Sequence, residues 1–533
     1  MKRLKNWLPW VSGVVAVSGV LAALDVLGPP LSGWPAYFFL CALSTALIWF
    51  AWRRVIPKDG PRWILIAMIV AIMLRFAVGI SLTYALPIFG YDNRHQQTGF
   101  YFPDAFMRDR EALKLADSDK PLVSAFSGEE QGDQYGGLMF VISAIYRVLS
   151  PDAHRQMLVL VFTALASALA VLFTWGFANI TFNNKAAVIA VWSVAVYPEA
   201  VLLGSSQMRE PFLILGIAMT LYGYARAREG YSRSGWIVIL VGVVLTLFFS
   251  PPFGVMGLGI AATVWLWERK VDLRRISWGV VLFFFIALLA VYLTINAWAG
   301  IENSPVGSVG ELVNWWLSAG ARYELSNLRK ASGMVRLLIE QTPLWAHLPM
   351  ATGNGLVQPF LPAALMDNTG SILARTIAIW RAAGWFILLP LLTYALFAAF
   401  RRAGIRSIQS YLALLVWGTA LLVSYRTAGD QWDNVRYRVV FLAAQAALAG
   451  WAWTHARRTG SPWLRRVIIV VGVATLLFIQ WYAGRYYNTP SLSLYTTIGV
   501  LGVFFVTYLI GVVSLDMWKA RRSPRLTGGN PEV

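Results

Sequence analysis

Apolar segments long enough to cross a lipid bilayer recur along most of this chain of 533 residues. A membrane-spanning helix needs roughly 17–25 predominantly apolar residues, and many of the runs have that length. Only 13% of the residues are charged, against about 25% in ordinary soluble domains. The short segments of alternating polarity that are typical of a transmembrane β-barrel are absent from the sequence. The sequence therefore predicts an all-α polytopic membrane protein.

The formal net charge of +19 comes largely from basic residues that cluster in short segments between the apolar runs. These segments read MKRLK, RRVIPKDGPR, ARAREGYSR, WERKVDLRR, RRAGIRS, HARRTGSPWLRR and KARRSPR. Lys and Arg concentrate in the cytoplasmic loops of membrane proteins, so topology explains most of the excess charge. We therefore expect the lipid bilayer as a partner and no nucleic acid.

Placing the basic segments in the cytoplasm gives about 14 transmembrane helices, with both termini cytoplasmic. They include spans near 276–298 and 438–455. Two long polar segments, 87–134 and 300–375, then become structured outer loops. Three apolar segments follow the first loop, at 136–149, 156–177 and 186–203. One of them cannot cross, because both ends of this region lie outside. The shortest is 136–149, which would be about 21 Å long as a helix against a hydrocarbon core of about 30 Å. We expect it to lie along the outer face or to dip into it.

This topology divides the chain into five parts. The N-terminal apolar run has no small-x-small cleavage site directly after it, so we expect it to remain as the first span. The parts are an N-terminal transmembrane hairpin (1–60), a transmembrane module with the first outer loop and the expected catalytic residues (61–299), the second outer loop (300–375), a C-terminal transmembrane module (376–517) and a cytoplasmic tail (518–533).

The segment GSSQMREPF, residues 204–212, places two charges between long apolar runs. The predicted topology puts Arg209 and Glu210 at the outer surface of the membrane. Pro211 suits the first turn of a following helix, and Ser205 or Ser206 could cap its start. The free N–H groups of such a helix start, together with Arg209, favour an anion such as a phosphate.

Two further polar clusters fall on the same outer face. The first loop holds many of the acids of the chain, among them Asp92 and Asp104, and Asp104 follows GFYFP at the start of an amphipathic helix. Asp104 could instead be a helix N-cap, and the acidic loop a solvated surface. In the loop SYRTAGDQWDNVRYRVV, Arg436 and Arg438 suit a lipid phosphate, or could form a structural salt bridge with Asp430 or Asp433.

The residue types suggest transfer of a group from a lipid phosphate on the outer side. A carboxylate can act as general base on an acceptor hydroxyl or amine, and arginines can neutralise a departing phosphate. A thiolate metal site is excluded because the chain has one cysteine, and its four histidines show no metal-ligand spacing.

These motifs resemble those of the membrane glycosyltransferases of the GT-C fold, in particular the family of protein O-mannosyltransferases and aminoarabinose lipid A transferases. The similarity is carried by FPDAFMRDREALKLADSDKPL, by DQYGGLMFVISAIYRVL with its Tyr135, by AAVIAVWSVAVYPEAVLLGSSQMRE, and by DNVRYRVVFLAAQAALAG. The oligosaccharyltransferase catalytic subunits share this layout more distantly. The resemblance covers about residues 60–455.

The resemblance implies a donor in which a sugar is linked to a polyprenyl phosphate, and an inverting transfer to an acceptor. It makes Asp104 the catalytic base and Glu210 a second acid that helps to orient acceptor or phosphate. Arg209 and Arg436 would hold the donor phosphate. Asp92 is the reserve candidate for the base, and Arg438 and Tyr135 are further candidates for substrate binding.

Two positions depart from the family pattern. Ala105 replaces the acid that often follows the first Asp, and Glu210 stands where an Asp is usual. These departures leave open the acceptor class and whether a divalent cation, Mg or Mn, takes part. From the length of the chain and the lack of an organelle signal, we expect a bacterial inner-membrane protein, with its active site on the outer face.

Three other readings remain open at this stage. A polysaccharide ligase or polymerase would also use a lipid-linked donor on the outer face. A transporter or flippase would place its site near the bilayer midplane, where Arg75 and Glu199 are the charges expected to lie deep. Glu199 could instead line the acceptor cavity from below. The third reading is a scaffold without catalytic activity.

Overall fold

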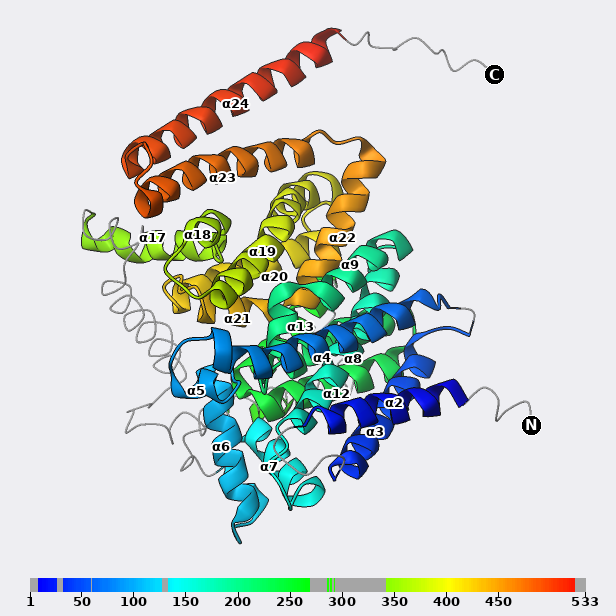
Figure 1. Ribbon diagram of the computed structural model, residues 1–533. Helices are drawn as coiled ribbons and strands as arrows, with labels where there is room; N and C mark the ends of the chain where they lie inside the picture. Colours follow the sequence, from blue (N-terminus) through cyan, green and yellow to red (C-terminus); the bar gives the residue numbers. More distant parts are fainter. Residues whose placement is uncertain are drawn as a thin grey trace, which may run out of the picture.

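The computed structural model describes residues 8–25, 32–58, 60–126, 133–268 and 342–522, and isolated positions between 285 and 292. All regular structure in these ranges is helical (Figure 1). The helices of the first half are α2 (Leu8–Ala23), α3 (Trp34–Val55), α4 (Trp63–Phe89), α5 (Arg94–Gln97), α6 (Pro103–Asp117), η1 (Leu122–Phe126), α7 (Gly137–Leu149), α8 (Met157–Thr181), α9 (Asn184–Val196), α10 (Pro198–Gly204), α11 (Glu210–Arg228), α12 (Ser232–Phe249) and α13 (Pro251–Glu268).

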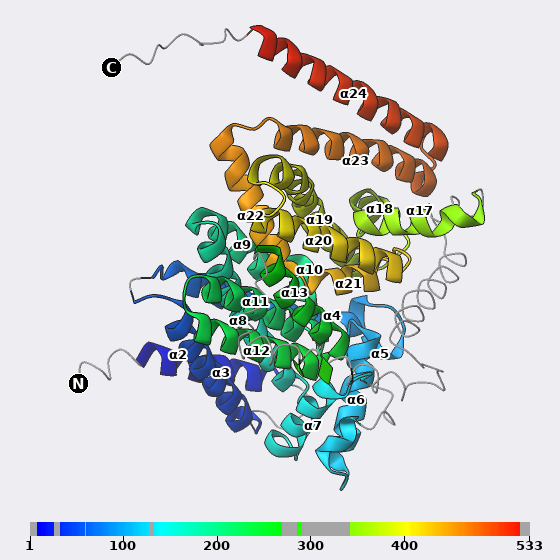
Figure 2. The same cartoon turned by 180° about the vertical axis from the view of Figure 1, so that it is seen from behind.

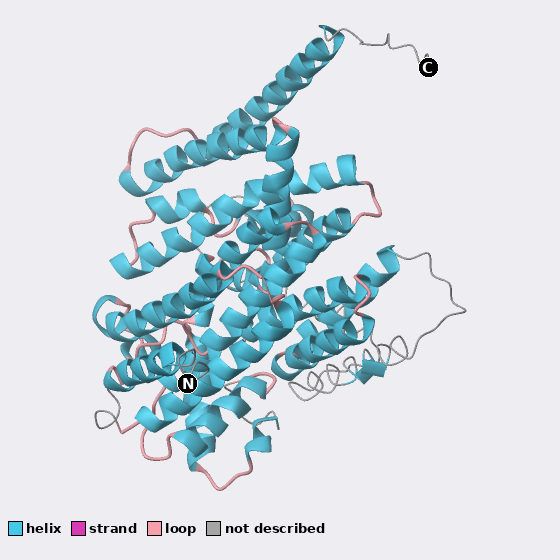
Figure 3. Cartoon of the chain, turned by 90° about the vertical axis from the view of Figure 1, so that its right-hand side faces the viewer, coloured by secondary structure: helices cyan, strands magenta, loops and turns pink. Residues whose placement is uncertain are grey.

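The second half follows the same pattern, and its last two helices lie at the opposite end of the molecule from α6 and α7 (Figure 2). Its helices are α17 (Leu344–Val357), α18 (Leu361–Met366), α19 (Ile372–Ala398), η2 (Ala399–Ala403), α20 (Ile408–Arg426), α21 (Asp433–Val439), α22 (Leu442–Thr459), α23 (Trp463–Tyr487) and α24 (Leu494–Arg522). No strand occurs within the ranges given above, as Figure 3 also shows. The predicted all-α class is confirmed.

Membrane character is confirmed, but the predicted number of about 14 spans is not. Seven of the described helices are long and apolar enough to cross a bilayer, or up to nine if each of two bent helix pairs is counted as one span. Four shorter apolar helices accompany them, in α2, α7, α12 and α13. The span expected at 276–298 and most of the second outer loop, 300–341, fall outside the described residues.

Helix α8 forms the centre of the first half. It packs against α3, α4, α9 and α11, and nearly all of its side chains are buried. The short segment expected at 136–149 is α7, a helix of 13 residues. It starts after Gly136, whose φ of +74° is accessible to glycine at little cost, and Asp133 accepts hydrogen bonds from the N–H groups of Leu138 and Met139.

The apolar run 186–203 is bent where a single span was expected. Helices α9 and α10 meet at 48°, and Pro198 starts α10, because a proline ring suits a first helical turn and interrupts a helix interior. Arg75 of α4 donates from Nη1 to the carbonyl of Ala195 at 2.6 Å and from Nη2 to that of Val194 at 3.3 Å. This deep charge is therefore bonded to the C-terminal carbonyls of α9.

A second bend, of 72°, separates α21 from α22 where the span 438–455 was expected. The short helix α21 carries Arg436 and packs against α10, α11 and α20. The two bends thus bring α10 and α21 together, although they are more than 200 residues apart in the chain.

Candidate active site

Arg436 joins the two acids that the sequence singled out. Its Nη1 donates to Asp104 Oδ2 at 2.6 Å and its Nε donates to Glu210 Oε1 at 2.5 Å. Asp104 comes from α6, Glu210 from the start of α11 and Arg436 from α21. Three segments spread over 332 positions therefore meet at one guanidinium group.

Asp104 does not cap its helix. Phe102 occupies the N-cap of α6 and Pro103 the first turn, so Asp104 lies inside the turn and its side chain is turned to Arg436. That side chain is 52% exposed. Partial burial by itself would raise the pKa of Asp104, but the charges of Arg436, Arg108 and Arg209 outweigh it and hold the pKa below its ordinary value. Asp104 is therefore an ionised carboxylate that remains accessible.

Glu210 differs from Asp104 in its access. Its side chain is 1% exposed and it lies behind Arg436, outside the residues that line the cavity. Pro211 occupies the first turn of α11, as expected. The predicted capping by Ser205 or Ser206 is wrong, because their hydroxyl groups donate back to the carbonyls of Val201 and Leu202 in α10. Glu210 thus holds the Arg436 guanidinium through a buried ion pair on the side away from the cavity.

Two more arginines surround this pair. The guanidinium of Arg209 is buried and lies 4.8 Å from the centre of the Tyr135 ring. Its Nε has no hydrogen-bond partner, and it makes no ion pair with any residue of the described ranges. Arg108 donates from Nη1 to the carbonyl of Gln207 at 2.7 Å, and its Nε lies 3.8 Å from Asp133. A buried cation such as Arg209 is costly without a counter-charge, which favours an anionic ligand here.

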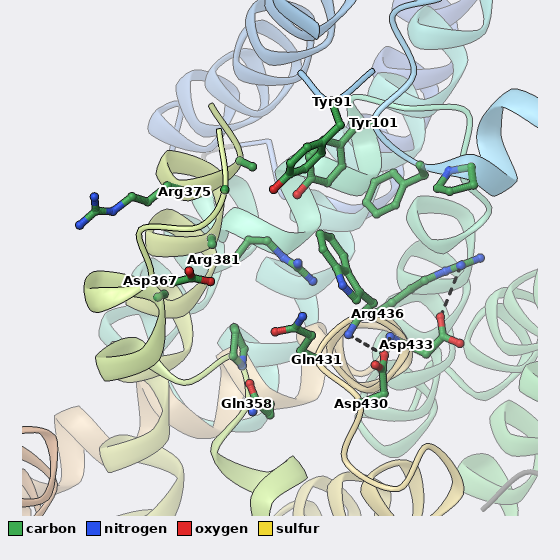
Figure 4. Close-up of a pocket in the computed structure, with 18 of the residues that line it drawn as sticks. Tyr91, Tyr101, Gln358, Asp367, Arg375, Arg381, Asp430, Gln431, Asp433 and Arg436 are labelled. Atoms are coloured by element: carbon green, nitrogen blue, oxygen red, sulfur yellow. Dashed lines mark hydrogen bonds and ion pairs between the residues drawn. The ribbon is translucent and has the colours of Figure 1, made fainter. Parts of the chain in front are cut away.

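Asp104, Arg108, Arg209 and Arg436 lie on one cavity of about 1300 Å³. Its walls come from the first outer loop, α17 to α19, the 429–437 segment and the end of α23. Figure 4 shows its polar lining, which includes Tyr91, Tyr101, Gln358, Asp367, Arg375, Arg381, Asp430, Gln431 and Asp433. The cavity is thus polar over much of its lining and rich in guanidinium groups.

The other candidates lie outside this lining. Asp92 is exposed beside Tyr91, and Tyr135 supports Arg209 from the side. Arg438 is buried, donates from Nη1 to the carbonyl of Gly355 at 3.3 Å and from Nη2 to that of Gln358 at 2.5 Å, and stacks on Trp385. Arg438 therefore contacts the backbone around α17, and its contact with substrate stays a prediction.

Glu199 also has a partner that the sequence analysis missed. Arg381 of α19 donates from Nε to Glu199 Oε2 at 2.5 Å and from Nη2 to Oε1 at 3.0 Å, and both side chains are almost fully buried. A lone arginine in the apolar run IAIWRAAGWF was the available signal, because charges inside a membrane segment are rarely unpartnered. The missed Arg108 stands four positions after Asp104, so both lie on one helix face.

A smaller apolar cavity of about 450 Å³ adjoins the polar one. Its lining comes from α17, α18, α19, α23 and α24 and consists mainly of Val, Leu, Ile, Phe and Trp. Pro359 and Phe360 line both cavities. A polar cavity and an apolar cavity between helices are therefore adjacent.

Asp104 and Glu210 are not arranged to hold a divalent cation. Asp104 and Glu210 are both paired with Arg436, and Arg108 and Arg209 add positive charge nearby. Among the described residues, no group of three or more His, Cys, Asp or Glu side chains is arranged to hold a metal ion. Divalent metals prefer sites whose carboxylates are free to coordinate.

The comparison with protein families bears directly on this site. Residues 138–295 match the family model of the dolichyl-phosphate-mannose-protein mannosyltransferases. The resemblance to GT-C membrane glycosyltransferases drawn from the sequence is confirmed. The matched segment contains Arg209 and Glu210, whereas Asp104 and Arg436 lie outside it.

Solved structures with a similar chain path include two of the oligosaccharyltransferase from Archaeoglobus fulgidus. One is AglB in complex with an inhibitory peptide and a dolichol-phosphate, with 14% identity and a TM-score of 0.41 over 84% of this chain. The other is the apo form, with 12% identity and a TM-score of 0.40 over 85% of this chain. The chain spans 55% of the length of each of them. No curated protein sequence matches the chain.

Proposed function

We propose that the protein is a membrane glycosyltransferase that moves a sugar from a polyprenyl-phosphate-linked donor to an acceptor on the outer membrane face. The observation that carries the proposal is the convergence on Arg436 of an accessible carboxylate, Asp104, and a buried one, Glu210. The buried Arg209 beside them, whose Nε has no hydrogen-bond partner among the described residues, supplies a site for the donor phosphate. The family match supports a sugar linked to a lipid phosphate as the donor class.

The proposed reaction is a single displacement. Asp104 accepts the proton of the acceptor hydroxyl or amine, and the acceptor atom attacks the anomeric carbon. The bond between that carbon and the phosphate oxygen breaks, and polyprenyl phosphate leaves with the electron pair. Arg436, Arg209 and Arg108 offset the negative charge that develops on the phosphate.

This proposal assigns Glu210 a positioning role, because it is buried behind Arg436. A retaining enzyme needs a second carboxylate as nucleophile, about 5 Å from the acid–base group and facing the sugar. Glu210 does not line the cavity, which favours inversion with Asp104 as the one base of the pair. The adjoining apolar cavity offers room for the first isoprene units of the donor.

The proposal can be tested with the purified chain in liposomes that contain polyprenyl-phosphate-linked mannose and a membrane extract as acceptor. We expect release of polyprenyl phosphate together with a mannosylated product whose anomeric configuration is opposite to that of the donor. Movement of the intact donor across the bilayer without release of polyprenyl phosphate would support a flippase instead. Transfer of preassembled oligosaccharides in preference to a single sugar would support a ligase.

A further inference from the structure

We propose that Trp432 is a stacking surface for a pyranose ring in the polar cavity and thereby determines which sugar the protein accepts. This inference rests on the proposed function. Trp432 lines the cavity and remains 44% exposed, so its ring is accessible to a ligand. Aromatic faces are suited to the apolar C–H face of a sugar, since both are flat and weakly polar.

The indole of Trp432 is supported on one face. The guanidinium carbon of Arg381 lies 4.7 Å from the centre of the ring, a cation–π distance. Arg381 is itself held by two hydrogen bonds to Glu199, so it cannot swing away without leaving a buried carboxylate unpaired. The Tyr101 ring lies 5.9 Å from Trp432 and is tilted by 53°. Trp432 and Tyr101 thus form an aromatic corner of the cavity.

The backbone of Trp432 is fixed as well. Asp430 Oδ2 accepts hydrogen bonds from the N–H groups of Trp432 at 2.7 Å and of Asp433 at 2.8 Å. Trp432 directly precedes α21, which carries Arg436. A ring bound against the indole would therefore lie near the guanidinium group assigned to the donor phosphate. Preorganisation of this kind lowers the entropy cost of binding.

The experiment compares two substitutions in the full chain, reconstituted in nanodiscs. Trp432→Leu keeps an apolar side chain but removes the flat ring, and Trp432→Phe keeps a ring. The binding of polyprenyl-phosphate-linked mannose and of bare polyprenyl phosphate is titrated for each protein. We expect Trp432→Leu to weaken binding of the mannosylated lipid about tenfold, a loss of about 1.4 kcal/mol. Binding of bare polyprenyl phosphate should stay within about twofold, and Trp432→Phe should retain most of the affinity.

The kinetic arm tests whether the stacked ring belongs to the donor. A rise in KM for the donor alone, with kcat little changed, assigns the stacked ring to the donor. A rise in KM for the acceptor alone would overturn the inference, because it would assign the stacked ring to the acceptor. If Trp432→Leu weakens binding of both lipids equally, or changes binding of neither, the inference is overturned. Sugar transfer by the wild-type protein would in that case leave the proposed function intact. A wild-type protein that transfers no sugar and binds both lipids equally would instead contradict the proposed function.

Discussion

Replacing Asp104 by Asn separates its proposed catalytic role from a structural one. The side chain is 52% exposed, and its partner Arg436 keeps a second, buried ion pair with Glu210. Loss of one half-exposed ion pair should change the free energy of unfolding by no more than about 1 kcal/mol. Loss of a general base should lower kcat by about 10²–10⁴-fold. Asp104→Asn should therefore give a folded protein that is nearly inactive.

Asp433→Asn is the matched control. The Asp433 carboxylate also lines the cavity, lies 3.7 Å from the same Arg436 guanidinium and is 41% exposed. The assay measures initial rates of mannose transfer in liposomes, with thermal unfolding of each purified variant measured in parallel. We expect Asp433→Asn to keep kcat within about tenfold of wild type, since only a general base contributes 10²–10⁴-fold. Full transfer by Asp104→Asn, or equal losses in both variants, would refute the assignment of the base.

Three further predictions follow from the same geometry. Because the neighbouring arginines hold the pKa of Asp104 below its ordinary value, its ionised form and its ion pair persist as pH rises and are lost only as pH falls through the folded-state pKa. We therefore expect kcat/KM to show no titration of this group between about pH 5 and 8. Arg209→Gln should weaken binding of bare polyprenyl phosphate about tenfold or more. It should not lower the unfolding temperature, because it removes a buried cation that lacks an ion-pair partner among the described residues. A marked loss of stability would contradict this prediction. Gly384→Ala places a Cβ 2.6 Å from Cδ of Pro198 and should destabilise the protein by about 1–3 kcal/mol, whereas Gly418→Ala, which meets nothing within 4 Å, should not.

The sequence allowed good prediction of composition-driven features, namely helical structure and membrane character, whereas the chemistry of the site stays a prediction. The sequence identified three candidate site residues, because charged side chains between apolar runs are energetically costly and often functional. They are Arg209, Glu210 and Arg436. Their convergence with Asp104 was a hypothesis that rested on topology and on family resemblance, and the three contacts of the Arg436 guanidinium bear on it directly.

Other features could not be predicted, because side-chain direction depends on packing. Hydropathy showed that 186–203 and 438–455 are apolar, but not that each is bent, by 48° and 72°. The exposure of Asp104 and the burial of Glu210 have no counterpart in local sequence, since both are acids in the first turn of a helix. Arg438 stands two positions after Arg436, yet it bonds to the backbone near α17 and not to the cavity.

The sequence by itself determined that the chain is helical and membrane-bound, because a backbone inside lipid must satisfy its own hydrogen bonds and long apolar runs have no other stable solution. Only the tertiary structure decided which charges share a cavity and which support it. A guanidinium can bridge carboxylates from distant segments only where helix packing and two bends bring those segments within hydrogen-bond distance. That long-range geometry is a property of the whole packed chain and of no single motif.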